Sequence, residues 1–115
     1  MKHAGQVVLF HFPQTDLEQG KLRPALLLGK IPGPYDDWLM WMISTQLWHR
    51  VEGFDEVVHD TDPDYASSGL RATSLIRVGR LAVTRADRIV GTTGQIAMSR
   101  LKAIKSRLAG WLTSS

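Results

Sequence analysis

Arg23 has the sequence surroundings that best suit chemistry on a phosphate group. It directly precedes Pro24 and the continuous apolar run 25–28. A guanidinium stays charged at neutral pH and offers a rigid fork of five donors that matches phosphate oxygens. Proline fixes its own φ angle and biases the preceding residue toward extended backbone. We therefore expect Arg23 to project from a defined position at the start of a strand, and the alternative is an ordinary surface arginine.

Proton transfer near that arginine would need a histidine, because imidazole titrates close to neutral pH. The chain has four histidines, and two of them lie near chemically interesting segments. His11 belongs to an apolar segment that we predict to be the first strand, and His49 follows Ser44 by five residues. Either histidine could serve a site that contains Arg23, and the alternative for both is a solvated or structural role.

Charge is distributed unevenly along the chain. Residues 36–64 contain eight acidic residues and one basic residue, whereas residues 71–115 contain nine basic residues and one acidic residue. A basic half can attract a polyanion such as RNA. The alternative is that the two halves neutralise each other within the fold or across a dimer. The acidic residues of segment 55–64 lack the spacing of calcium loops and of zinc sites, so we predict a solvated loop, no metal and no cofactor.

Composition indicates one globular domain over residues 1–115. Hydrophobic residues make up 43% of the 115 residues, enough for a buried core. Cysteine is absent, which excludes disulfides and thiolate metal sites. The apolar stretches are much shorter than the roughly 20 residues of a membrane helix, and we see no secretory signal. We therefore expect a cytoplasmic protein without membrane contact.

Hydrophobic periodicity predicts strands first and a helix last. Strands are predicted at residues 7–12, 24–28, 38–46 and 73–83, with shorter ones within 51–58 and at 88–90. Residues 13–20 and 60–69 are predicted to be loops, and Gly91 and Gly94 are expected to break the chain. From Ala97 onward apolar residues recur at helical spacing, with basic residues on the outer face. This order predicts a mainly β fold, an antiparallel barrel or curled sheet closed by a C-terminal helix.

The order and spacing of several segments resemble the PemK/MazF family of bacterial toxins, which are small ribonucleases. Residues 18–28 resemble the Gly-x-x-Arg-Pro-x-Leu hallmark of that family, and weaker matches occur at 5–9, 43–46, 69–77, 80–82 and 89–91. The resemblance implies a small SH3-like, CcdB-like barrel that forms a homodimer. It also implies inhibition by a cognate antitoxin and metal-independent cleavage of single-stranded RNA.

The resemblance also implies which residues form the site. Arg23 matches the family's catalytic arginine, Ser44 stands where the family usually has threonine, and Arg77 matches a second arginine of PemK-type members. Contacts with RNA are expected from Gln19, Gly20, Lys21, Thr45, Gln46, Trp48 and Arg80. Two positions depart from those members, because Gly79 replaces an aspartate and Leu17 replaces a histidine. An arginine-plus-hydroxyl site is therefore favoured over their acid–base pair.

Cleavage without a metal would use the 2′-hydroxyl of the RNA as nucleophile. Arg23 suits stabilisation of the phosphorane charge, and it is a poor general acid because its pKa lies far above neutrality. Trp48 is the best candidate for stacking on a base, whereas Trp38 and Trp41 are expected in the core or a dimer interface. Two alternatives remain. One is a non-catalytic CcdB-type toxin or degenerate family member that acts by binding a protein, and the other is a general interaction module.

Overall fold

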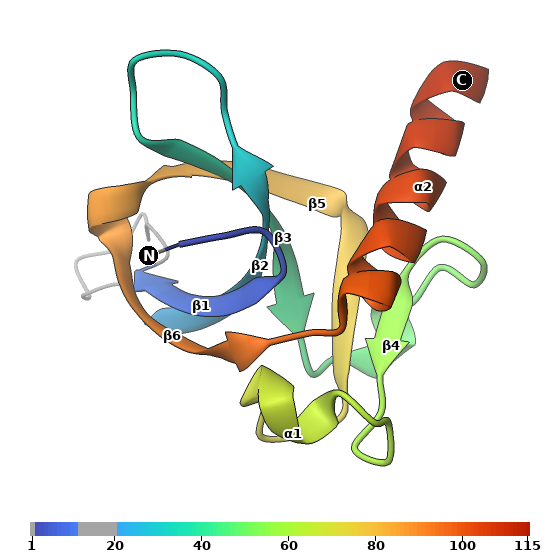
Figure 1. The fold of residues 1–115 in the computed structure, drawn as a ribbon. Coiled ribbons are helices and arrows are strands. Elements are labelled where there is room, and N and C mark those ends of the chain that lie inside the picture. Colours follow the sequence, from blue (N-terminus) through green and yellow to red (C-terminus); the bar gives the residue numbers. More distant parts are fainter. Residues whose placement is uncertain (1, 12–20) are drawn as a thin grey trace.

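The computed structural model describes residues 2–11 and 21–115, in which six antiparallel strands form one strongly curled sheet (Figure 1). The order across the sheet is β4-β5-β3-β2-β1-β6. The strands are β1 (Gln6–His11), β2 (Leu22–Lys30), β3 (Asp37–Ser44), β4 (Glu56–Val58), β5 (Ser74–Arg85) and β6 (Ile89–Gln95). The helices are α1 (Tyr65–Ser68) and α2 (Met98–Ser114), with 3-10 turns η1 (Leu47–His49) and η2 (Ala86–Arg88). The predicted class, a mainly β antiparallel fold with a C-terminal helix, is confirmed; the sheet curls like a barrel without closing.

β3 is buried on both faces, as its alternating pattern predicts. Trp41 and Ile43 pack into one hydrophobic cluster, and Trp38 and Met40 pack into a second one. The first cluster also contains Leu101, Ile104 and Leu108 from α2. A fully buried side chain of this size contributes about 1.5–3 kcal/mol, so these clusters fix β3 and α2 firmly. Trp38 and Trp41 therefore belong to the core.

α2 confirms the predicted helix and its buried face, but the prediction for its outer face is partly wrong. Arg100 and Arg107 turn toward acidic residues that precede β5 instead of pointing into solvent. Trp111, one of the apolar residues that recur at helical spacing from Ala97 onward, is half exposed and forms a T-shaped contact with Phe54. No helix within the described residues is long and apolar enough to span a membrane.

Two glycine-containing segments differ from the prediction. Residues 60–69 are not only a loop, because they contain the short helix α1, which ends at Gly69 with a left-handed φ of 71°. β6 continues through Gly91 and Gly94 because it pairs with β1. A Cβ atom at Gly94 would lie 2.0 Å from the carbonyl oxygen of Ser67. The glycine therefore allows α1 to approach β6 closely and does not break the strand.

Candidate active site

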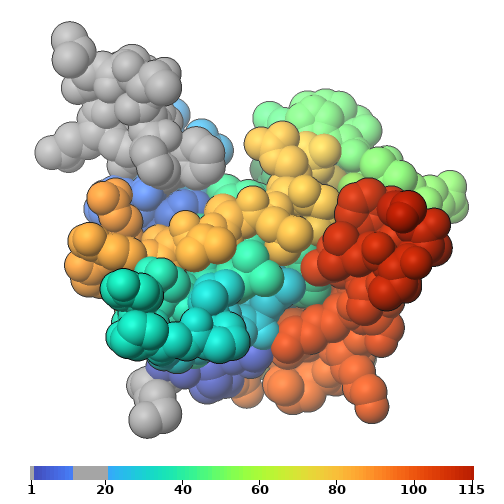
Figure 2. Space-filling model, turned by 90° about the horizontal axis from the view of Figure 1, so that it is seen from above, coloured from blue at the N-terminus to red at the C-terminus, as the bar shows by residue number. Residues whose placement is uncertain are grey.

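A pocket of about 470 Å³ opens where β2 begins, β3 ends and β5 begins. Figure 2 shows β5, in yellow to orange, crossing one face of the molecule between α2 and the turn that joins β2 to β3. Twelve of the described residues line the pocket: Leu22, Arg23, Pro24, Met42, Ile43, Ser44, Thr45, Gln46, His49, Ser74, Arg77 and Arg80. We call this site the arginine pocket.

The arginine pocket brings together six of the ten residues that the sequence predicted for the site. Arg23, Ser44, Arg77, Thr45, Gln46 and Arg80 line it. Lys21 and Trp48 are exposed and are not part of the lining. Gln19 and Gly20 lie outside the described residues, as does Leu17.

Arg23 lines the pocket because it pairs with β1 but lies beyond the residues of β2 that pair with β3. Its neighbour on β1 is Phe10, so the backbone of Arg23 is fixed on that side. The pairing of β2 with β3 begins only at Ala25, which lies opposite Met42. The corner between the start of β2 and the end of β3 is therefore open, and Arg23 lies at this corner.

Arg77 and Arg80 share the pocket because β5 carries a bulge of three residues. Leu81 pairs with Trp41, while Arg77 pairs with the next residue, Met42. The intervening residues of β5, among them Gly79, are therefore unpaired with β3. In a regular strand, residues three apart point to opposite faces, so the bulge is what places both arginines in one lining.

Two buried side chains hold the bulge at Val78. The indole Nε1 of Trp41 donates to the carbonyl oxygen of Val78 at 2.9 Å. The amide nitrogen of Val78 donates to Asp55 Oδ1 at 3.0 Å, and Asp55 Oδ2 accepts from the amide of Val51 at 2.9 Å. Because both polar groups of Val78 are satisfied inside the protein, the bulge is a defined structure and not a frayed strand.

A tight turn after β3 positions Ser44 and His49. The amide of Gln46 donates to Ser44 Oγ at 3.0 Å, and the amide of His49 donates to the carbonyl oxygen of Gln46 at 3.1 Å. The Ser44 hydroxyl therefore accepts a hydrogen bond from the backbone. Its own hydrogen remains able to donate to a phosphate oxygen.

The electrostatics of the arginine pocket favour an anion. Its twelve described lining residues include three arginines and no carboxylate. Nε of Arg77 is buried and has no hydrogen-bond partner among the described residues. Leaving a buried donor unpaired costs free energy, commonly about 1–3 kcal/mol, unless a ligand supplies the acceptor. A phosphate group, with several acceptor oxygens and negative charge, meets this requirement.

The sequence matches over residues 3–112 the family described as "PemK-like, MazF-like toxin of type II toxin-antitoxin system". The chain belongs to this family. The resemblance stated from the sequence is thereby confirmed, and the protein is a type II toxin of the PemK/MazF family. No curated protein matches the sequence significantly.

Two solved structures share the fold of this PemK/MazF toxin. A MazE-MazF complex (Form-II) from Deinococcus radiodurans has 22% sequence identity and a TM-score of 0.68, covering 99% of this chain and 97% of that one. An endoribonuclease in complex with its cognate antitoxin from Mycobacterial species has 17% identity and a TM-score of 0.64, covering 98% and 96%. At these identities the likeness extends to the fold alone.

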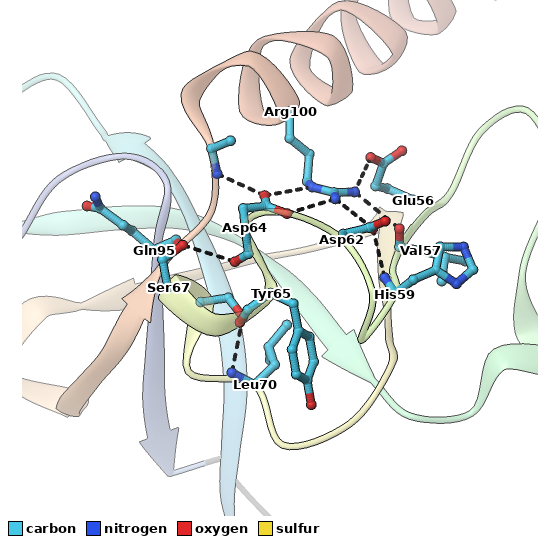
Figure 3. Close-up of polar contacts among 12 residues, drawn as sticks. Glu56, Val57, His59, Asp62, Asp64, Tyr65, Ser67, Leu70, Gln95 and Arg100 are labelled. Carbon is cyan, nitrogen blue, oxygen red and sulfur yellow. Dashed lines mark hydrogen bonds and ion pairs between the residues drawn. The ribbon is translucent and has the colours of Figure 1, made fainter.

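The acidic segment of the toxin forms ion pairs with α2, so the predicted solvated loop is wrong for Glu56, Asp62 and Asp64. The alternative that the acidic and basic halves neutralise each other within the fold describes these residues. Arg100 contacts Glu56, Asp62 and Asp64 at 2.6, 2.8 and 2.9 Å (Figure 3). Arg107 also contacts Glu56. We call these five residues the ion-pair network. Within the described residues no group of histidine, aspartate or glutamate side chains is arranged to hold a metal ion.

Hydrogen bonding within the network shifts the pKa values of its members. The bond from Arg100 lowers the pKa of Asp64 below its ordinary value of 3.8, against the opposing effect of burial. The backbone amide of His59, followed by Arg100, lowers the pKa of Asp62 in the same direction. The pKa of Arg100 is raised above its ordinary value, chiefly by its hydrogen bonds to Asp64. All three groups therefore stay charged at neutral pH.

The sequence left His49 open as one of two proton carriers, and it missed Ser74 altogether. Both line the arginine pocket, whereas His11 does not. The signal for His49 was its position just after the Ser44 strand. Ser74 gave no comparable signal in the sequence, because a serine at the start of a strand is common. In the structure its buried hydroxyl donates to the carbonyl oxygen of Ala72.

Proposed function

We propose that this toxin is a metal-independent endoribonuclease that cleaves single-stranded RNA. The observation that carries the proposal is the arginine pocket, whose described lining contains three arginines, the Ser44 hydroxyl and no carboxylate. Such a pocket suits a phosphodiester whose negative charge grows during the reaction. Fixed donors aimed at developing charge are commonly the largest contribution to catalysis.

In the proposed reaction the 2′-hydroxyl of the RNA attacks the adjacent phosphorus. Arg23 and Arg77 stabilise the phosphorane oxygens, and Ser44 donates to a phosphate oxygen or orients the 2′-hydroxyl. Arg77 has a specific reason to bind the phosphate, because its buried Nε has no other partner among the described residues. Arginine acts here through charge and hydrogen bonds, since it cannot give up a proton near neutral pH.

RNA on either side of the cleaved bond is proposed to contact the rim of the pocket. Thr45, Gln46 and Arg80 line the pocket itself. The Trp48 side chain is 76% exposed and directly precedes His49 of the lining. Stacking of a base on such a ring contributes about 1–3 kcal/mol. Further contacts are proposed for Gln19, Gly20 and Lys21.

We also propose that the toxin acts in the cytoplasm as a homodimer and is inhibited by a cognate antitoxin. Support for the antitoxin comes from the two structural neighbours, which are a MazE-MazF complex and an endoribonuclease with its cognate antitoxin. The cytoplasm and the homodimer rest on the family resemblance. An antitoxin segment that carries acidic residues would fit the positive arginine pocket, because complementary charge favours association.

The proposal is tested by incubating a long unstructured RNA with the wild type and with Arg23→Ala in EDTA. We expect wild-type fragments that end in a 2′,3′-cyclic phosphate and a 5′-hydroxyl. Arg23→Ala should cut about 100- to 1000-fold more slowly with an unchanged melting temperature. The matched control is Arg85→Ala, because Arg85 is exposed and lies outside the pocket. Equal cleavage by wild type and Arg23→Ala would remove Arg23 from the mechanism.

A second candidate is a non-catalytic toxin that binds a protein. It is favoured by Gly79, which stands where related toxins have an aspartate, and by the absence of carboxylates from the described pocket lining. Growth arrest by the wild type without any RNA fragments would support this candidate and contradict the first one.

A further inference from the structure

The arginine pocket has an excess of hydrogen-bond donors and a shortage of groups that can accept a proton. Among the described residues its charged side chains are Arg23 from β2 and Arg77 and Arg80 from β5, and none of them accepts a proton near neutral pH. Serine and threonine hydroxyls are likewise too weak as bases. Cleavage through the 2′-hydroxyl nevertheless requires that its proton be taken up.

His49 is the single described lining residue with an imidazole, and His3, His11 and His59 lie outside the lining. We propose that His49 is the catalytic base that takes the proton of the RNA 2′-hydroxyl, an inference that rests on the proposed ribonuclease function. No carboxylate of the described residues lines the pocket to compete for this role.

The position of His49 is fixed by the turn that follows β3. Its backbone amide donates to the carbonyl oxygen of Gln46, and the amide of Arg50 closes the turn on the carbonyl oxygen of Leu47 at 3.1 Å. The imidazole meets the edge of the Trp48 ring, with 5.5 Å between ring centroids. The same short segment therefore carries the proposed base and the proposed stacking surface. A nucleotide stacked on Trp48 would be held beside the imidazole.

The proposed step conserves atoms and charge. The neutral imidazole accepts the 2′-hydroxyl proton as the 2′-oxygen forms a bond to phosphorus. The bond between phosphorus and the 5′-oxygen then breaks, and the leaving oxygen takes a proton from water. The imidazolium gives its proton to the hydroxide that remains. The products are a 2′,3′-cyclic phosphate and a 5′-hydroxyl.

The test compares His49→Gln with the wild type, and His59→Gln is the matched control. We expect kcat/KM of His49→Gln to fall by about 100-fold or more, which is typical for loss of a general base. Wild-type kcat/KM should rise with pH, because only a neutral imidazole accepts a proton, and the variant should lose this rise. Added imidazole should restore part of the lost rate in His49→Gln and none in Arg23→Ala. His59→Gln should match the wild type in rate and pH profile.

A binding measurement separates a catalytic role from a structural one. An RNA analogue with a 2′-deoxy nucleotide at the cleavage point cannot be cut, and its affinity for His49→Gln should equal that for the wild type. Wild-type rate and pH profile in His49→Gln would overturn the assignment of His49 and leave the ribonuclease proposal intact. Absence of cleavage by the wild type itself would instead overturn the proposed function.

Discussion

Arg100 and Arg77 differ in how far the protein satisfies the hydrogen-bond donors of their guanidinium groups. All five donors of Arg100 are used, in bonds to Glu56, Asp62, Asp64 and the carbonyl oxygen of Val57. Arg77 has a buried Nε with no partner among the described residues. The same side chain therefore contributes to stability in the ion-pair network and is left available for a ligand in the arginine pocket. A basic residue in the sequence is therefore a candidate for ligand binding only after the fold has shown whether an acidic residue pairs with it.

The two regions are physically connected through the segment before β4. Arg107 of the network donates from Nη1 to the carbonyl oxygens of Phe54 and Asp55, each at 3.1 Å. The carboxylate of Asp55 in turn accepts from the amide of Val78 in the β5 bulge, directly beside Arg77. The network thus supports the segment that positions the pocket arginines.

The largest effect on stability is expected from Arg100→Met. Removing this guanidinium leaves three carboxylates close together, one of them on Asp64, which is 8% exposed. We expect a loss of about 3 kcal/mol in unfolding free energy. This value is at the lower end of the losses found when one partner of a buried ion pair is removed, because the network is partly accessible to solvent. Denaturant unfolding measures it. Arg85→Met is the control, since the Arg85–Asp87 pair is exposed and should contribute less than about 1 kcal/mol. Equal losses in both variants would contradict a special role of the network.

The opposite pattern is expected for Arg77→Met. Methionine keeps most of the apolar stem and removes both the charge and the unpaired Nε. Cleavage should fall about 100-fold or more, because a charge-stabilising donor is lost. The melting temperature should stay equal or rise, since an unsatisfied buried group disappears. Thermal unfolding and a cleavage time course test the two parts separately. A large fall in melting temperature would show that Arg77 serves the fold, as Arg100 does.

Sequence patterns predicted the hydrophobic core more completely than they predicted the ion-pair network or the arginine pocket. The alternation of β3 and the helical spacing of α2 were sufficient for the core, because burial follows directly from periodicity. The pairing of acidic and basic halves was one of two alternatives, and only tertiary structure selected it. The spacing of three residues between Arg77 and Arg80 would place their side chains on opposite faces of a regular strand. Spacing alone therefore did not predict that both arginines line one pocket.

The β5 bulge explains why local patterns could not define the site. It depends on Asp55, which is 23 residues away in the chain from the amide that it binds. Similarly, Gly91 and Gly94 suggested a chain break. The structure shows that Gly94 instead allows the close approach of α1, a segment distant in sequence. Long-range backbone contacts of this kind leave no periodic signal in a single sequence.

An intermediate effect is expected for Asp55→Asn, which tests the connection between the two regions. Asp55 is 4% exposed, and each of its carboxylate oxygens accepts a backbone amide. Asparagine would direct its own NH₂ group at one of these amides, so we expect a loss of about 1–3 kcal/mol in unfolding free energy. Displacement of the bulge should also slow cleavage about tenfold, because catalysis depends on precise placement.

The control for Asp55→Asn is Asp60→Asn, since Asp60 is exposed and lies outside the pocket lining. It should leave stability and cleavage close to wild type. Reduced stability of Asp55→Asn with full cleavage by the folded protein would show that the bulge persists without the carboxylate and that the two regions are independent.

The smallest effect is the dependence of stability on acid pH. The pKa values of Asp62 and Asp64 are lowered in the folded protein, so their contribution is complete above the ordinary value of 3.8. It is lost as the pH falls through the lower folded values, because the unfolded chain then binds more protons. The melting temperature of the wild type should therefore fall below about pH 4, and less steeply in Arg100→Met, where the main cause of the Asp64 shift is gone. Thermal melts from about pH 2.5 to 7 test this. Parallel curves for the two proteins would mean that Arg100 does not hold these carboxylates in their charged form.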